Sequence, residues 1–124
     1  SLGVTPGFGG TTRLVRQVGV HRALQLLSTG EIMRADKALS WGLINEVVPQ
    51  DELSARVEAI AAQICKNAPM AVAASKRSAR RAAEMDLGAA NAYEQQIFGM
   101  CFSTAEQKEG MAAFVEKRAP NWSK

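Results

Sequence analysis

The ratio of helical to β-prone segments limits what this chain can fold into. From residue 51 onward, apolar side chains such as Leu53, Val57 and Ile64 recur at the spacing of one helix face. Only residues 2–6 and 43–48 have the composition of short strands. Because two short strands cannot form a stable sheet, we expect a mainly helical chain whose sheet is either incidental or completed elsewhere.

Prolines, glycines and capping side chains mark the expected helix ends. The helices are expected over residues 11–18, 21–28, 35–41, 51–67, 69–85, 87–101 and 105–118. The expected N-caps are Thr11 or Thr12, Asp51, Asp86, and Ser103 or Thr104. Glu106 would complete a capping box if Ser103 is the cap, and Pro69 suits a first helical turn. Gly110 lies inside the last helix, which predicts that another group packs closely against its backbone.

Composition excludes several classes of protein. The 124 residues fit one small domain, and 47% hydrophobic with 22% charged residues is typical of a soluble globular chain. We find no apolar run near the ~20 residues of a membrane span and no signal-peptide pattern, so we expect a cytoplasmic protein. One histidine and two isolated cysteines predict no metal site and no disulfide framework. A net charge of +3 is too small to indicate nucleic-acid binding by itself.

The loop Gly7-Phe8-Gly9-Gly10 is the first candidate for chemistry. A phosphate-binding P-loop would need a lysine after the glycines, and none follows. A dinucleotide fingerprint would need Gly or Ala at the position of Thr12 and a strand before the loop. Two interpretations remain, a tight turn into a helix or a set of exposed amides that contact water or substrate.

The other polar and aromatic clusters favour structural roles. The basic run from Lys76 to Arg81 is expected to be a solvated helix surface with its charges spread over more than one face. We expect His21 to lie at the surface or to cap a helix. The aromatic residues Tyr93, Phe98, Phe102 and Phe114 favour core or interface positions, although a pocket for an apolar tail would use the same residue types.

Four stretches resemble the enoyl-CoA hydratase/isomerase (crotonase) family in order and spacing. Residues 2–14 read Leu-Gly-Val-Thr-Pro-Gly-Phe-Gly-Gly-Thr-Thr-Arg-Leu, and residues 27–31 read Leu-Ser-Thr-Gly-Glu, followed by Ala35 and Ala38. Residues 41–49 read Trp-Gly-Leu-Ile-Asn-Glu-Val-Val-Pro, and residues 103–120 resemble the family's C-terminal helix. The resemblance implies the C-terminal helical part of the α/β crotonase spiral fold. Residues 1–49 would be the end of the spiral core with a short strand, and residues 50–124 a helical region for trimerisation and for covering the active site.

The resemblance also implies roles for individual residues. Gly7 matches the glycine whose backbone amide binds the catalytic water in hydratases. Phe98, Phe102 and Phe114 match or lie beside positions that line the acyl and pantetheine path. Lys117 matches a lysine that reaches the phosphates of CoA, often across a subunit interface. The two glutamates that activate water would precede Ser1, so we expect this chain to be inactive by itself.

The function expected from the resemblance is therefore part of an enoyl-CoA hydratase, which adds water to a trans-2-enoyl-CoA. The substrate is an acyl-CoA thioester, no cofactor or metal is required, and the parent would be a homotrimer or hexamer without nucleic-acid or membrane partners. Two alternatives remain open. One is isomerisation or another reaction on CoA esters, and the other is an oligomerisation module without catalysis.

Overall fold

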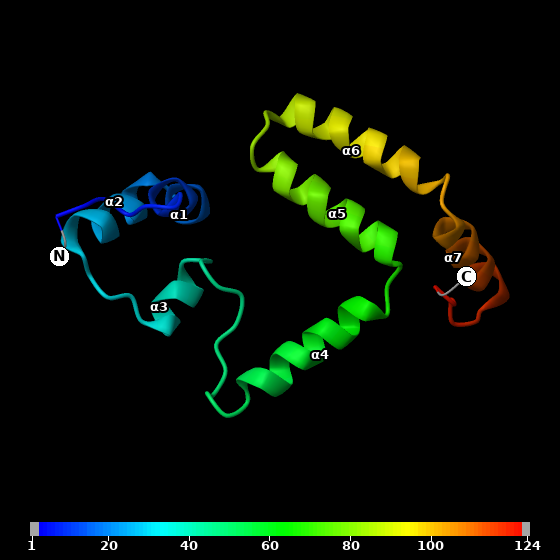
Figure 1. The fold of residues 1–124 in the computed structure, drawn as a ribbon, viewed down its shortest axis with the longest axis horizontal. Coiled ribbons are helices and arrows are strands. Elements are labelled where there is room, and N and C mark those ends of the chain that lie inside the picture. The colour runs from blue at the N-terminus through cyan, green and yellow to red at the C-terminus, as the bar shows by residue number, and fades with distance from the viewer. Residues whose placement is uncertain (1–2, 123–124) are drawn as a thin grey trace. The chain divides into compact units, whose positions relative to one another are not determined.

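The computed structural model describes residues 3–122 and is built of α-helices joined by short loops (Figure 1). The helices of this range are α1 (Gly10–Val18), α2 (Val20–Thr29), α3 (Ala35–Ser40), α4 (Leu53–Cys65), α5 (Pro69–Ala82), α6 (Leu87–Cys101) and α7 (Ala105–Glu116). Residues 3–122 contain no β-strand. The prediction of a mainly helical chain is confirmed, and the helix positions agree with the prediction to within a few residues at each end.

The chain divides into two compact units, Ser1–Leu53 and Ser54–Lys124. In the first unit, α1 and α2 pack against each other (Figure 1). Gly19 joins them with a φ of 82°, a backbone conformation that favours glycine. The contact buries Val18 of α1 and Ala23 of α2. The glycine-rich loop lies immediately before α1, so this helix pair fixes where the loop begins and ends.

In the second unit, α5 and α6 form a helical hairpin, and α7 follows α6 after a short turn (Figure 1). Ala74 of α5 and Ile97 of α6 are buried, and Ala113 of α7 is also buried. Small side chains therefore fill most of the buried positions, which lets the helix backbones approach closely.

Several predicted helix signals are confirmed by hydrogen bonds. Pro69 is the first residue of α5. A carboxylate oxygen of Asp86 accepts a hydrogen bond of 3.0 Å from the Ala89 amide at the start of α6. Thr104, not Ser103, caps α7, because its hydroxyl oxygen accepts from the Gln107 amide at 3.1 Å.

One other cap prediction is wrong, and the condition for the capping box, a cap at Ser103, is not met. Helix α1 is not capped by Thr11 or Thr12, because Gly9 with a φ of 75° starts the helix earlier. Thr12 then lies in the first turn, where its hydroxyl donates back to the Gly9 carbonyl at 3.2 Å. Glu106 does not form a capping box within α7. Its carboxylate instead accepts from the Met70 amide, at 2.9 and 3.2 Å, and so caps the first turn of the neighbouring helix α5.

The predicted short strand over residues 43–48 is not formed. The Leu43 amide donates to the Ala38 carbonyl at 2.9 Å, so this segment begins by closing the end of α3. A strand needs a partner for its ladder of hydrogen bonds, and residues 3–122 offer none. Residues 3–6 are also irregular, and Leu2 of the other expected strand end lies outside the described residues.

Most large apolar side chains of the described residues remain exposed. Helix α4 has no buried residue, although Leu53, Val57, Ile60 and Ile64 form the apolar face that the sequence predicted. On α6 and α7 and in the turn between them, the exposed set is Leu87, Phe98, Met100, Phe102, Met111, Phe114 and Val115. The two units therefore present apolar helix faces that they do not bury themselves.

The helices were also compared with the requirements of a membrane span. Within residues 3–122, none combines the length and the apolar character needed to cross a bilayer.

We predict that Asp86→Ala lowers the free energy of unfolding by about 1 kcal/mol, because it removes the acceptor for the Ala89 amide. Asp86→Asn is the matched control, since it keeps a side-chain oxygen in that position, and it should remain close to the unchanged protein. Urea unfolding followed by far-ultraviolet circular dichroism measures both. Equal losses in the two variants would contradict a capping role.

Candidate functional site

The glycine-rich loop is held by hydrogen bonds that leave Gly7 accessible. The Gly10 amide donates to the Gly7 carbonyl at 2.9 Å, which closes the turn. The Arg13 guanidinium donates to the Phe8 carbonyl at 2.7 Å and ties the loop to α1. A Cβ placed on Gly7 would meet no atom within 4 Å, and none of residues 3–122 accepts a hydrogen bond from the Gly7 amide. The loop therefore offers a backbone donor with open space beside it.

Phe8 is the residue of this loop that the sequence did not single out. Its φ of 54° is the left-handed conformation, which is uncommon for a bulky aromatic residue. The side chain is fully exposed. The two features together place an aromatic ring in solvent next to the accessible Gly7 amide, on a backbone that Arg13 holds.

The structure brings Phe98 and Phe102 together. They lie one turn apart on α6 and its C-cap, and their ring centroids are 5.1 Å apart at an interplanar angle of 67°. Phe98 lines a groove between α5 and α6 with a volume of about 560 Å³, whose other lining residues are mostly small or apolar, among them Ala74, Ile97 and Cys101. An apolar chain could lie in such a groove.

Phe114 and Lys117 belong to the end of α7. Phe114 is largely exposed and makes no ring contact with the other two phenylalanines. Lys117 follows the helix in the left-handed conformation, with φ 54° and ψ 38°. It is exposed, and its ammonium pairs with no carboxylate of the described residues. It therefore presents an unneutralised positive charge.

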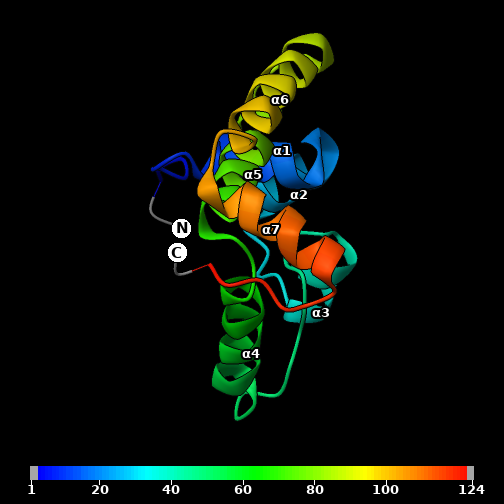
Figure 2. The ribbon, with the colours of Figure 1, turned by 90° about the vertical axis from the view of Figure 1, so that its right-hand side faces the viewer.

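The predicted close contact at Gly110 is confirmed. A Cβ on Gly110 would lie 3.3 Å from the ring of Trp122. The Trp122 indole also donates to the Lys66 carbonyl at 2.8 Å. The chain after α7 thus turns back and runs beside the helix, as Figure 2 shows.

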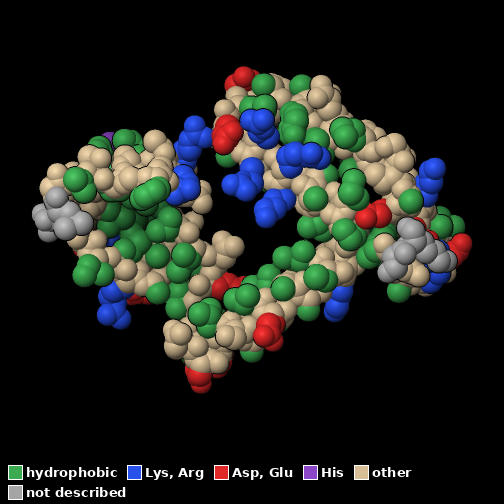
Figure 3. Space-filling view, in the orientation of Figure 1, with side chains coloured by type: hydrophobic (Ala, Val, Ile, Leu, Met, Phe, Trp, Pro, Cys, Tyr) green, Lys and Arg blue, Asp and Glu red, His purple; other side chains and the backbone are tan. Residues whose placement is uncertain are grey.

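The basic residues of α5 share one face, contrary to the prediction. Lys76, Arg77, Arg80 and Arg81 line a single shallow hollow with Ala73 and Glu84. Figure 3 shows Lys and Arg side chains gathered along this helix. At 3.6 residues per turn these four positions span an arc of only ~140°, which explains the shared face. Of the four, Arg81 pairs with Glu84 at 3.7 Å.

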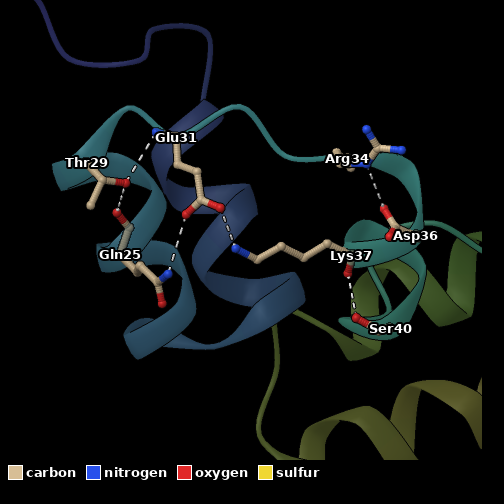
Figure 4. A network of polar contacts seen from close by, with 7 residues as sticks. All are labelled: Gln25, Thr29, Glu31, Arg34, Asp36, Lys37 and Ser40. Carbon is tan, nitrogen blue, oxygen red and sulfur yellow. Dashed lines mark hydrogen bonds and ion pairs between the residues drawn. The ribbon is translucent and has the colours of Figure 1, made fainter.

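A polar network in the first unit is structural rather than reactive (Figure 4). The Lys37 ammonium lies 2.6 Å from the Glu31 carboxylate, which joins the end of α2 to α3. The Thr29 hydroxyl donates to the Gln25 carbonyl at 2.7 Å and accepts from the Glu31 amide at 3.2 Å. Lys37 also lies 4.9 Å from the centre of the Trp41 ring. Glu31 is therefore engaged with a cation and is not a free base.

The acidic, histidine and cysteine side chains were examined as metal ligands. Among residues 3–122, no group of three such side chains lies close enough together to hold a metal ion. Cys65 is exposed, Cys101 is half-buried, and both are free thiols.

Comparison with known proteins assigns the class of protein. The family model for enoyl-CoA hydratase/isomerase matches residues 1–124. The chain therefore belongs to the enoyl-CoA hydratase/isomerase family. The expected fold, the helical part of the crotonase fold, is confirmed by the solved structures that it resembles.

Individual relatives define the similarity more narrowly. The chain is 50% identical over 117 residues to the short-chain-enoyl-CoA hydratase of Clostridium acetobutylicum, a match that covers 94% of this chain and 45% of the relative. It is 47% identical over 121 residues to the crotonyl-CoA hydratase of Syntrophomonas wolfei, covering 98% of this chain and 46% of the relative. A crystal structure of an enoyl-CoA hydratase from Geobacillus kaustophilus matches with a TM-score of 0.94 and 41% identity, over 98% of this chain and 46% of that one. The chain spans about half the length of the curated relatives it matches.

The Glu31 contact has a measurable pH dependence. The hydrogen bond and then the charge of Lys37 hold the pKa of the Glu31 carboxyl below its ordinary value of 4.5. Because the folded pKa is depressed, the contact stabilises the fold above pH 4.5 and is lost as the pH falls through the folded pKa.

We predict that Lys37→Met returns the pKa of Glu31 toward 4.5, as measured by NMR titration of the carboxyl carbon. Arg34→Met is the control, since Arg34 pairs with Asp36 at 3.7 Å and not with Glu31. An unchanged pKa of Glu31 in Lys37→Met would contradict the assignment of the shift to Lys37.

Proposed function

We propose that this chain supplies the CoA-binding and assembly part of an enoyl-CoA hydratase. The observation that carries the proposal is its similarity to curated hydratases over nearly its whole length, at 50% and 47% identity. The substrate would be a trans-2-enoyl-CoA, and the reaction would add water across the double bond conjugated to the thioester. The reaction would need no cofactor, and CoA would enter only as a portion of the substrate.

Gly7 would act through its backbone. Its amide is accessible and has no acceptor among the described residues, so it can donate a hydrogen bond to the attacking water. A side chain at this position would occupy the space that the water needs. The amide orients the water but cannot take its proton, and that step needs a general base.

The described residues place no such base in contact with the loop. Among the described residues, the side chains that donate to the loop carbonyls are Thr12, which binds the Gly9 carbonyl, and Arg13, a cation, which binds the Phe8 carbonyl. We therefore propose that carboxylates outside this chain activate the water and that the chain has no hydratase activity by itself.

The CoA end of the substrate would lie on the second unit. Phe98, Phe102 and Phe114 expose apolar surface for the acyl and pantetheine portions. Lys117 would offer a phosphate its ammonium, which pairs with no carboxylate of residues 3–122. A lysine suits this role because its charge sits on a long flexible stem. The assembled protein would be a cytoplasmic homotrimer or hexamer, without nucleic-acid or membrane partners.

The activity can be tested with the chain alone and in a chimera. The part of the Clostridium acetobutylicum hydratase outside the matched region is joined ahead of Ser1, and loss of the enone absorbance of crotonyl-CoA is followed. We predict no turnover by the chain alone and hydration by the chimera. Turnover by the chain alone at the rate of the chimera would overturn the proposal, and so would a folded chimera without activity.

Isomerisation is the alternative reaction within the same family, because the residues that choose between the two lie outside this chain. Mass spectrometry and N-terminal sequencing of the protein isolated from its source would show what precedes Ser1. Glutamates at both family positions would favour the hydratase, and their absence would favour another reaction on CoA esters.

A purely assembling role is a second candidate, favoured by the apolar faces of α4, α6 and α7 that the units leave exposed. We predict that the chain in solution has a mass above that of a monomer, measured by light scattering, since burial of apolar surface drives association. A monomeric mass together with cooperative unfolding would show that the exposed faces need no partner.

A further inference from the structure

The backbone at Lys117 is unusual for a helix end. A left-handed residue commonly follows a helix, and glycine is the usual choice because it has no Cβ. This chain uses glycine where α2 ends, with Gly30 at φ 65°. At the end of α7 it places Lys117 in the same conformation, with φ 54°. The lysine side chain is thus kept at a position where glycine would be less strained.

Arg118 holds this strained turn in place. Its guanidinium forms two hydrogen bonds with the carboxylate of Glu109, of 2.6 and 3.1 Å, and a third with Glu116 at 2.5 Å. The Arg118 amide also donates to the Ala113 carbonyl at 3.0 Å, which closes the helix end around Lys117. Glu109 is only 18% exposed, so its carboxylate depends on these partners. The hydrogen bonds of Arg118, first with Glu109 and then with Glu116, raise the pKa of the Arg118 guanidinium above its ordinary value.

A second anchor lies at Asn121, three residues after Arg118. The Asn121 amide donates to the same Glu109 carboxylate at 2.8 Å. Trp122 then packs on Gly110 and donates to the Lys66 carbonyl at 2.8 Å. Glu109 thus binds the chain at two points after Lys117, and α7 and the returning segment hold the left-handed residue between them. Strained residues persist where the surroundings overdetermine them, and such residues concentrate at functional sites.

We propose that Arg118, bound to Glu109, is a positioning residue that fixes Lys117 in the left-handed conformation and so directs its ammonium to a phosphate of coenzyme A. The inference rests on the proposed function, because Lys117 is a phosphate ligand only in that account. Lys117 touches the ligand, whereas Arg118 and Glu109 act through its backbone.

The experiment compares two substrates of the active chimera. Crotonyl-CoA carries the phosphates, and crotonyl-pantetheine has the same reacting group without them. Arg118→Leu and Glu109→Gln are each expected to raise the KM for crotonyl-CoA about tenfold, the loss of roughly one charge-assisted hydrogen bond, with kcat unchanged. The KM for crotonyl-pantetheine should not change, and a merely structural role would affect both substrates alike.

Two further variants separate the inference from the proposed function. Lys117→Ala should raise the KM for crotonyl-CoA alone, and Lys108→Ala, which removes an exposed cation from the same helix, should change neither KM. If Lys117→Ala has no selective effect, the assignment of Lys117 to CoA fails. If Lys117→Ala is selective but Arg118→Leu and Glu109→Gln are not, the positioning role is overturned while the proposed function stands.

The backbone claim is tested without substrate, on the chain itself. NMR chemical shifts of the Lys117 Cα and carbonyl carbons report the left-handed conformation, and Arg118→Leu should shift both toward averaged values. Lys117→Gly should keep the conformation and unfold at an equal or higher temperature, since it relieves strain. Left-handed shifts that persist unchanged in both Arg118→Leu and Glu109→Gln would overturn the positioning role even if the chimera were inactive.

Discussion

The main physical constraint on this structure is that most large apolar side chains of residues 3–122 are exposed to solvent. Among residues 3–122, the buried side chains are Val18, Ala23, Ala38, Ala74, Ile97 and Ala113, most of them small. The larger apolar side chains of α4, α6 and α7 stay exposed, so burial within the units contributes little hydrophobic stabilisation. Local interactions therefore contribute a larger part of the stability of each unit. They include the helix caps, the Glu106 contact with α5 and the hydrogen bonds of Arg118, Asn121 and Trp122. We propose that other polypeptide covers these exposed faces.

Local chemistry made much of the fold predictable. Pro69 and Asp86 act within the first turns of their own helices, and the structure confirms both. The close contact at Gly110 was predicted from a glycine inside a helix, but its partner Trp122 is known only from the structure. Glu106 and residues 43–48 show competition between local and more distant partners. Glu106 faces two helix starts and caps α5, and residues 43–48 have the composition of a strand but no strand to pair with. Composition cannot tell which partner is present, so these outcomes required the structure.

The local features of the candidate site were also predictable from the sequence, whereas its longer-range contacts were not. The glycine loop follows from Gly7, Gly9 and Gly10, and the pairing of Phe98 with Phe102 follows from their spacing of one helical turn. The pairing of Arg118 with Glu109 could not be predicted, because Glu109 lies nine positions away and meets Arg118 only after the chain reverses. A lysine where glycine usually follows a helix was the available signal, but a left-handed conformation is visible only in the structure.

We propose that this chain binds the CoA end of a substrate while other polypeptide performs the chemistry. The most direct measurement mixes the purified chain with the separately purified remainder of the Clostridium acetobutylicum hydratase and follows hydration of crotonyl-CoA. We predict that neither component is active and that activity appears when both assemble into one complex. Hydration by the chain without its partner, or a stable complex that leaves crotonyl-CoA unchanged, would contradict it.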